Sequence, residues 1–288
     1  MKYDLQNFIG IFDSGIGGIS VLNELISRMP SENYIYFADS ANFPYGKKSK
    51  EELISIGKGI LSNFTKLNAK SIVIACNTMS TSDMECFNST FPNVKIIGTF
   101  PSFTHIFKPG LILSNQSISY DKDNGISINR ERKKLLLIAT TATCKSEFLN
   151  DFVNQLKGFI DIYVEPADFI AKAVENDAID TFEFRRLLSE LFKEYSNLDY
   201  LMLGCTHFPF ALNEIKKIVD GNVIITSGCE ATADNCYNYL NKNNLLINNK
   251  NPKIKIIDKN LNEDKKKLYN KLIAINGNSH TIEFSKTF

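Results

Sequence analysis

Two short stretches of the chain carry the residues that suggest chemistry, and they share one design. Residues 71–79 read SIVIACNTM, and residues 199–207 read DYLMLGCTH. In each stretch an apolar run ends at a small residue, and a cysteine then precedes Asn-Thr or Thr-His. Short apolar runs bounded by turn residues are typical of buried strands in parallel sheets. We therefore expect Cys76 and Cys205 to lie at two similar corners, each just beyond the end of a strand.

A cysteine at such a corner can act as a base. An isolated thiol has a pKa of about 8.5 and is mostly protonated at neutral pH. A helix N-terminus favours the thiolate, and helices are expected after both cysteines, so we expect the pKa of both thiols to be lowered. Two thiols on opposite walls of a cleft could remove a proton from one face of a carbon centre and return one to the other face. A cysteine hydrolase or a decarboxylase needs only one thiol, and it remains an alternative at this point.

Each cysteine has a polar residue nearby, in the sequence or in the expected fold, that could adjust the protonation of its thiol. His207 lies two positions after Cys205 and could orient its proton or relay it. Asp13 follows the apolar run at 8–12 and is the expected partner of Cys76. We therefore predict that Cys76, Cys205, Asp13 and His207 are the catalytic residues.

The turn at 13–18 reads DSGIGG and is expected to bind a small charged ligand. A glycine-rich turn that opens a helix presents backbone N–H groups to an anion. The turn lacks both the GxGxxG spacing of dinucleotide sites and the lysine of a P-loop, which favours a single carboxylate or ammonium group. Short polar side chains that could hold the charged groups of an amino acid follow the strand ends: Ser14, Asn77, Thr78, Thr141, Thr143 and Thr206.

The composition of the chain excludes several classes of protein. The chain has 288 residues, with 43% apolar and 23% charged residues and a net charge of +1, which is ordinary for a globular protein and gives no bulk charge for nucleic-acid binding. No apolar stretch approaches the ~20 residues of a membrane span, and the N-terminus does not resemble a signal peptide. With six cysteines, no CxxC pair and three histidines, we expect cytoplasmic thiols and no metal site.

Alternating strand and helix patterns predict an α/β fold with mainly parallel sheets. The pattern restarts near residue 135: Cys205 follows Cys76 by 129 residues, and Thr140 follows Asp13 by 127. We expect two similar domains that face each other across a cleft, because functional residues lie beyond the carboxyl ends of parallel strands. The predicted first domain is 1–100 plus 211–288, the second is 101–210, and residues 109–134 form an extra β-hairpin.

Five segments of the sequence, taken together, resemble the glutamate racemases of the aspartate/glutamate racemase superfamily. They occur in the order of that family over most of residues 8–240, and they read IGIFDSGIGGISVL, YFADSANFPYGKKS, VIACNTMST, IATTATCKSEF and LMLGCTHFPF. The GCTH corner favours the glutamate branch over the aspartate branch. The resemblance implies a cofactor-independent, two-base amino-acid racemase that interconverts L- and D-glutamate and supplies D-glutamate for peptidoglycan. It also implies that the protein is a homodimer and that its binding partner is a small-molecule substrate, L- or D-glutamate.

The resemblance assigns roles to individual residues. Cys76, assisted by Asp13, would deprotonate D-glutamate, and Cys205, assisted by His207, would deprotonate L-glutamate. The implied substrate-binding residues are Ser14 near the ammonium group, Asn77, Thr78 and Thr206 on the α-carboxylate, the backbone amides of Tyr45 and Gly46 on the side-chain carboxylate, and Thr143 in the wall.

The sequence departs from this family in three places. The hairpin at 109–134 is extra length, TFPSF replaces the acidic residue and proline that usually follow Gly98, and residues 166–168 read Pro-Ala-Asp where Ala-Cys-Pro is frequent. Glu175, by contrast, matches a recurring glutamate. Two alternatives remain: an aspartate or other amino-acid racemase on the same scaffold, and a catalytically silent relative that binds an amino acid or a protein. The first would differ in the pocket, and the second would have no use for two opposed thiols.

Overall fold

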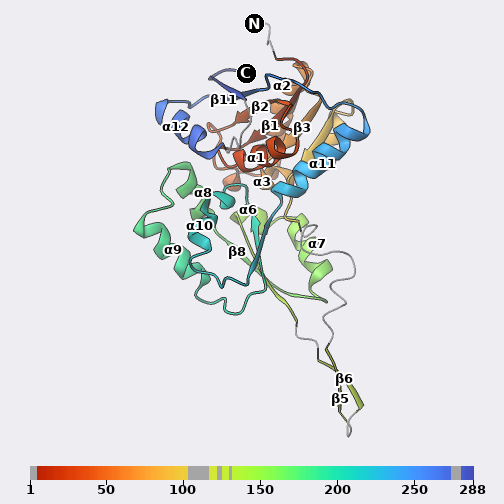
Figure 1. Cartoon of the computed structure of the whole chain (residues 1–288), viewed down its shortest axis with the longest axis vertical. Helices are drawn as coiled ribbons and strands as arrows, with labels where there is room; N and C mark the ends of the chain where they lie inside the picture. The colour runs from red at the N-terminus through yellow and green to blue at the C-terminus, as the bar shows by residue number, and fades with distance from the viewer. Residues whose placement is uncertain (1–4, 103–116, 122–124, 130–131, 274–279) are drawn as a thin grey trace.

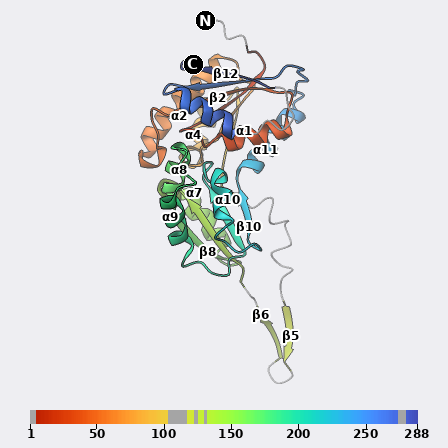
Figure 2. The same cartoon turned by 60° about the vertical axis from the view of Figure 1, so that its left-hand side comes forward.

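The strands that the structure describes form two parallel sheets and one hairpin (Figure 1). The computed structural model describes residues 5–102, 117–121, 125–129, 132–273 and 280–288. In the two views the sheets lie one beyond the other along the long axis of the molecule (Figures 1 and 2). Figure 1 shows helices α3 (Asn77–Ser80), α6 (Thr141–Cys144) and α8 (Asp168–Glu175) near the junction. This arrangement confirms the predicted α/β fold with two parallel sheets.

The first sheet has six strands in the order β12-β11-β2-β1-β3-β4, and all of its pairs are parallel. Its strands are β1 (Phe8–Asp13), β2 (Asn33–Ala38), β3 (Ser71–Ile74), β4 (Lys95–Gly98), β11 (Lys253–Asp258) and β12 (Thr281–Ser285). The central strands β1, β2 and β3 are buried along their whole length, as expected for a parallel sheet that is covered on both faces.

Alternate residues of β1 show how the helices cover both faces. Phe8 and Phe12 pack in a core with residues of α2 and α4, whereas Ile9 and Ile11 pack in a second core with residues of α1 and α11. The helices and the 3₁₀ turn of this half are α1 (Ile19–Arg28), η1 (Tyr45–Lys47), α2 (Lys50–Lys66), α3 (Asn77–Ser80), α4 (Met84–Thr90), α11 (Cys229–Lys242) and α12 (Glu263–Leu272). This alternation follows from the period of two along a strand.

The second sheet has four parallel strands in the order β10-β9-β7-β8. Its strands are β7 (Lys134–Ala139), β8 (Asp161–Pro166), β9 (Tyr200–Gly204) and β10 (Ile224–Ser227). Helix α7 (Glu147–Leu156) packs on one face through Leu149, and α8 (Asp168–Glu175) and α9 (Phe182–Phe192) pack on the other. The short elements α6 (Thr141–Cys144), η2 (Phe208–Ala211) and α10 (Leu212–Ile215) follow the ends of β7 and β9.

The boundary between the two sheets lies later in the sequence than predicted. Strand β10 pairs in register with β9, so residues up to Ser227 belong to the second sheet and the return to the first begins with α11. The predicted boundary after residue 210 therefore assigns β10 to the wrong sheet. A signal was present, because residues 223–226 read Val-Ile-Ile-Thr, a run of β-branched residues between Asp-Gly-Asn and Ser-Gly, but the predicted boundary was placed before it. We propose that the two sheets mark two domains, with the second extending to Ser227.

A two-stranded antiparallel hairpin interrupts the second half, as expected. Strands β5 (Ser117–Asp121) and β6 (Gly125–Asn129) pair directly, and they project away from both sheets (Figures 1 and 2). The remainder of the predicted segment includes 109–116, 122–124 and 130–131, which lie outside the described residues.

Candidate active site

A cavity of about 680 Å³ lies where the carboxyl ends of strands from both sheets meet. Every predicted site residue except Thr143 lines it: Asp13, Ser14, Tyr45, Gly46, Cys76, Asn77, Thr78, Cys205, Thr206 and His207. These residues follow β1, β3 and β9 or lie in the loop after β2. Two distant parts of the chain thus form one cavity, because the ends of parallel strands meet at one edge of each sheet.

The first corner of the cavity contains Cys76 and Asp13. Cys76 follows β3 and is the N-cap residue of α3, and its side chain is 6% exposed. Asp13 ends the neighbouring strand β1 and is fully buried. One carboxylate oxygen of Asp13 accepts hydrogen bonds from the backbone N–H of Ser14 at 2.6 Å and from its hydroxyl at 3.3 Å. The corner therefore holds a buried thiol close to a buried carboxylate.

The protonation of Cys76 differs from the expectation. Burial raises the pKa of the Cys76 thiol well above its ordinary value, and the negative charge of Asp13 raises it further. The backbone hydrogen bond at Met79 acts in the opposite direction but is the smaller effect. The prediction that a helix N-terminus would lower the pKa of this thiol was wrong, because α3 is only four residues long and the surrounding carboxylate and lack of water dominate.

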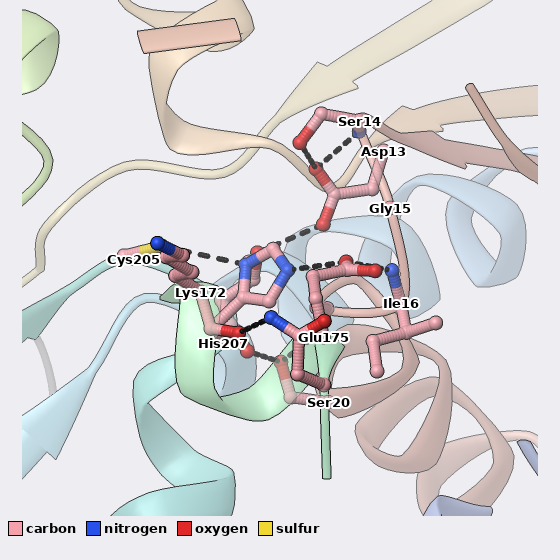
Figure 3. A network of polar contacts seen from close by, with 12 residues as sticks. Asp13, Ser14, Gly15, Ile16, Ser20, Lys172, Glu175, Cys205 and His207 are labelled. Atoms are coloured by element: carbon pink, nitrogen blue, oxygen red, sulfur yellow. Dashed lines mark hydrogen bonds and ion pairs between the residues drawn. The ribbon is translucent and has the colours of Figure 1, made fainter. Parts of the chain in front are cut away.

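The second corner contains Cys205, His207 and Glu175 (Figure 3). The sulfur of Cys205 lies 3.6 Å from Nδ1 of His207, and Nε2 of the same ring lies 2.8 Å from Oε1 of Glu175. Cys205 does not begin a helix directly, since two residues separate it from the 3₁₀ turn η2, in which Pro209 occupies the first turn. An imidazole, rather than a helix N-terminus, is thus the main partner of this thiol.

Cys205 and Glu175 together explain why His207 can carry a charge inside the protein. Burial alone would lower the pKa of His207, but hydrogen bonds and charge interactions with Cys205 and Glu175 outweigh it and raise the pKa well above the ordinary value. The ring is 2% exposed, so little water is available to screen this charge. A protonated His207 stabilises a thiolate on Cys205, as adjacent cationic groups do for reactive cysteines.

The glycine-rich turn binds an anion, and the anion comes from the chain itself. The backbone N–H of Ile16 donates to Oε1 of Glu175 at 2.6 Å, so a carboxylate of the second sheet is bound by a turn of the first. A Cβ on Gly15 would lie 1.9 Å from Oε1 of Glu175, and one on Gly17 would lie 2.2 Å from Nδ1 of His207. The glycines are therefore needed for close approach of these side chains. The carboxylate that this turn binds belongs to the chain, and the predicted binding of a ligand at the turn stays a prediction.

Two further hydrogen bonds connect the corners. The hydroxyl of Thr206, which follows Cys205, donates to the second carboxylate oxygen of Asp13 at 3.0 Å. The hydroxyl of Ser20, on α1, donates to the backbone carbonyl of Thr206 at 2.8 Å. The partner of the first thiol and the neighbour of the second are thus held in one network.

Three threonines form a hydroxyl cluster beside the first corner, around Thr78 of α3. The hydroxyl of Thr78 lies 3.0 Å from that of Thr140 and 3.3 Å from that of Thr143. Thr143 is fully buried and is not among the residues that line the cavity, and its predicted place in the wall around the substrate stays a prediction. It is the first residues of the Thr-rich turn, Thr140 and Thr141, that line the cavity, while Thr143 supports Thr78 from behind.

Asn77, Tyr45 and Gly46 complete the predicted set. The side-chain amide of Asn77 donates to the backbone carbonyl of Thr99 at 3.3 Å. The hydroxyl of Tyr45 donates to Asp39 at 2.8 Å, which anchors the loop that carries Gly46. A capping box of Ser49 and Glu52 then fixes the start of α2 directly after this loop.

Several cavity residues were missed by the sequence analysis. They are Phe43, Pro44, Lys47, Asp168, Phe169, Ala171, Lys172 and Asn176. Four of them lie on α8 at positions 168, 169, 171 and 172, where a helical spacing brings them to one side. The role of Glu175 was also missed, since only its match to a recurring glutamate had been noted. The sequence did contain one signal for these residues: Pro-Ala-Asp at 166–168 departs from the Ala-Cys-Pro of the family, and it lies at the start of α8, which forms this side of the cavity.

Comparison with known proteins identifies the family. No family model matches the chain. A glutamate racemase from Clostridium botulinum is 33% identical over 268 residues, which cover 92% of this chain and 96% of the relative. The chain belongs to the glutamate racemase family. A second member, from Clostridium acetobutylicum, is 31% identical over 263 residues and covers 90% of this chain and 94% of its own length. Family membership makes the chain an isomerase.

Solved structures of glutamate racemases share the fold. A Bacillus anthracis isoform has a TM-score of 0.74 at 24% identity, covering 98% of this chain and 97% of its own. A Francisella tularensis glutamate racemase, solved in complex with D-glutamate, has a TM-score of 0.74 at 24% identity and covers 97% of both chains. These likenesses confirm the racemase-like fold that the sequence predicted. Among the described residues, no helix has the length and apolarity to cross a membrane.

Proposed function

We propose that the protein interconverts L- and D-glutamate by two-base proton transfer at the α-carbon, with Cys76 and Cys205 as the two bases. The observation that carries the proposal is that both thiols line one cavity, each from a different sheet and each with its own polar partner. Membership of the glutamate racemase family supports the reaction and the substrate. The D-glutamate bound to the Francisella tularensis protein supports the same substrate class.

The two corners favour opposite protonation states before the substrate binds. Burial and the charge of Asp13 keep Cys76 as a thiol, whereas the imidazolium of His207 favours a thiolate on Cys205. With L-glutamate bound, the Cys205 thiolate removes the α-proton and the electron pair stays on the α-carbon. The Cys76 thiol then donates its proton to the opposite face, which gives D-glutamate and leaves Cys76 as the thiolate. The reverse reaction uses the same steps with the roles exchanged.

The cavity offers groups that suit the charges of an amino acid. We propose that Asp13 and Ser14 lie near the ammonium group and that Asn77, Thr78 and Thr206 hold the α-carboxylate. The backbone amides of Tyr45 and Gly46 would bind the side-chain carboxylate. Because Asp13 also tunes Cys76, binding of the ammonium group would change the charge that this thiol senses.

The main energetic difficulty is that an α-proton is very weakly acidic and a thiolate is a weak base. Fixed hydrogen-bond donors in a site that excludes water can stabilise the developing negative charge, and this is usually the largest catalytic contribution. The burial of the catalytic side chains meets the condition that water is excluded, since Cys76, Cys205 and Asp13 are all at most 7% exposed. Two thiols can supply both proton transfers, so we propose that no cofactor and no metal takes part.

We further propose a cytoplasmic homodimer that supplies D-glutamate for peptidoglycan. All six cysteines are free thiols, which suits a reducing compartment. The dimer and the biosynthetic role rest on the resemblance to glutamate racemases.

The proposal is tested by following the circular dichroism of L-glutamate and, separately, of L-aspartate with the purified protein and no added cofactor. We expect glutamate to racemise, with Cys76→Ser and Cys205→Ser each lowering the rate by about 10³-fold or more, because general acid–base groups contribute about 10²–10⁴-fold each. Faster turnover of L-aspartate would point to an aspartate racemase. A folded wild-type protein that acts on neither substrate would contradict the proposal and favour a silent binding protein.

A further inference from the structure

Four residues with full charges line the cavity, apart from the titrating Cys and His groups. Two are acids, Asp13 and Asp168, and two are bases, Lys47 and Lys172. The chain itself provides hydrogen-bond partners for the two acids but not for the two bases. The cavity therefore contains two positive charges that have no counter-ion among the described residues.

Both acids already have partners from the chain. Asp13 accepts hydrogen bonds from Ser14 and from the hydroxyl of Thr206. Asp168 accepts from the backbone N–H of Thr141 at 3.0 Å and from its hydroxyl at 2.5 Å. Hydrogen bonds of this kind stabilise the carboxylate form and reduce its demand for a cation.

Both lysines, in contrast, lack such a partner. Within the described part of the chain, no carboxylate lies within 4.0 Å of either ammonium group, and none of the hydrogen bonds found there involves their side chains. Even Asp168, one turn before Lys172 on the same helix, forms no ion pair with it and is turned to Thr141 instead. Lys172 lies on the helix that also carries Glu175, beside the second corner (Figure 3).

The two lysines come from opposite sides of the cavity. Lys47 ends η1, which follows Gly46 in the loop of the first sheet, and Lys172 lies in α8 of the second sheet. Both side chains are exposed, whereas the catalytic thiols are buried, so the lysines lie toward the solvent side of the cavity. The cavity therefore has a buried acidic group at Asp13. Nearer its mouth lie the two lysines and one exposed carboxylate, Asp168, which lies beside Gly46 and is hydrogen-bonded to Thr141.

We propose that Lys47 and Lys172 form a two-sided cationic mouth that recognises the side-chain carboxylate of the substrate. The inference rests on the proposed function, since it names what selects a dicarboxylic amino acid at that site. Glutamate carries one ammonium group and two carboxylates. If its ammonium group lies near Asp13 and its α-carbon lies between the thiols, its distal carboxylate extends away from Asp13 and meets the lysines. Lys47 is also adjacent to Gly46, whose backbone amide is the proposed neutral donor for the same carboxylate.

This role makes Lys47 and Lys172 specificity-determining residues rather than catalytic ones. They attract the substrate equally before and during proton transfer, because the charge of the distal carboxylate does not change in the reaction. Such uniform binding lowers KM and leaves kcat unchanged. Because both side chains are exposed, salt should screen the attraction, and its range at 0.15 M ionic strength is about 8 Å.

The test is steady-state kinetics of glutamate racemisation for Lys47→Gln, Lys172→Gln and the double variant at about 20 mM and about 500 mM NaCl, concentrations chosen to span weak and strong screening. At low salt we expect each single variant to raise KM about 3- to 5-fold and the double variant about 10-fold or more, with kcat retained, as expected for exposed charge pairs. At high salt the differences should shrink. Lys172→Arg should restore a KM near that of the wild type, because it returns the charge.

The matched control is Lys193→Gln, an exposed lysine that follows α9 and does not line the cavity. It removes the same charge and should leave KM unchanged. An unchanged KM in the double variant, a fall in kcat instead, or an equal effect of Lys193→Gln would overturn the inference while leaving the racemase activity intact. A wild-type protein that does not racemise glutamate would instead refute the proposed function itself.

Discussion

The two cysteine corners have nearly the same local sequence and opposite surroundings. Cys76 lies near a buried carboxylate, Asp13, whereas Cys205 lies 3.6 Å from an imidazole that is itself paired with Glu175. The carboxylate and the burial favour the protonated thiol at the first corner. The raised pKa of His207 places a positive charge beside the second thiol. The comparison teaches that the partner of each thiol, and not the repeated strand-to-cysteine design, determines the charge that surrounds it.

Two buried histidines repeat this lesson away from the cavity. His207 has a carboxylate partner, and its pKa is raised. His280 contacts a backbone carbonyl of Glu32 at 3.3 Å, its Nδ1 atom has no hydrogen-bond partner among the described residues, and burial lowers its pKa. Burial acts on both rings in the same direction, so the partners of His207, Cys205 and Glu175, account for the difference.

After the loss of a thiol, the largest loss of activity should come from Gly17→Ala, which disturbs the second corner only. Its Cβ would lie 2.2 Å from Nδ1 of His207, so the ring must move away from Cys205. A misplacement of about 1 Å can cost about 10²-fold in rate, and we expect a loss of kcat of that size. The control is Gly59→Ala in α2, where a Cβ meets nothing within 4 Å. This control should keep full activity and gain about 0.5–1 kcal/mol of stability, measured by thermal unfolding. Full activity of Gly17→Ala would contradict the assigned position of His207.

A smaller effect is expected from Glu175→Gln, which removes the carboxylate that raises the pKa of His207. We expect racemisation to fall about 10- to 100-fold, since the imidazolium that supports the Cys205 thiolate becomes less populated. The raised pKa keeps His207 protonated to higher pH in the wild type. In the variant, the loss of activity on the alkaline side should therefore begin at a lower pH. The measurement is the pH dependence of kcat/KM for both proteins, and identical profiles would refute this role of Glu175.

Thr143→Val addresses the wall near the first corner and should have a modest effect. It removes a buried hydroxyl that lies 3.3 Å from Thr78 and 3.0 Å from Thr140, while keeping the shape of the side chain. We expect a loss of about 1 kcal/mol of stability and an increase in the KM for glutamate of a few fold, since Thr78 loses one of its supports. Chemical denaturation and steady-state kinetics measure the two effects. A kcat loss as large as that of the cysteine variants would show that Thr143 has a direct role.

The smallest effect concerns the pH dependence of stability. The pKa of His280 is lowered in the folded protein, so the unfolded chain binds more protons at this residue. Its contribution to stability is therefore complete above about pH 6.5 and decreases as the pH falls below that value. His207 behaves oppositely, since its raised pKa adds stability that is lost only as the pH rises through the folded-state pKa. We expect His280→Gln to weaken the loss of stability between about pH 6.5 and 5 in urea unfolding, and an unchanged slope would contradict this assignment.

Much of the fold was predictable because it rests on local patterns. The apolar runs at 8–12, 71–75 and 200–204 are buried strands, and the residues just beyond them meet in one cavity as parallel strands require. Strand β10 was missed although its β-branched run, Val-Ile-Ile-Thr at 223–226, predicts a strand; what the local pattern could not give is its pairing with β9, which assigns it to the second sheet.

The partners within the site were harder to predict than the thiols themselves. Glu175 is 32 residues from His207 and 159 residues from Ile16, and it contacts both only because α8 packs against the glycine-rich turn. The direction of the Cys76 pKa shift was likewise not predictable, because it depends on burial and on the distance to Asp13. Contacts between distant segments are set by tertiary packing, which no local spacing encodes.

The central claim, one thiol for each face of the α-carbon, is tested most directly by α-proton exchange in D₂O with the single-cysteine variants. Cys76→Ser keeps the Cys205 base, so it should exchange the α-proton of L-glutamate but not of D-glutamate, without inversion. Cys205→Ser should show the reverse preference, and the wild type should form deuterated glutamate of both hands from either enantiomer. The readout is the loss of the α-proton NMR signal together with chiral chromatography. Exchange of both enantiomers by one variant, or an unchanged wild-type rate in either, would contradict the two-face account.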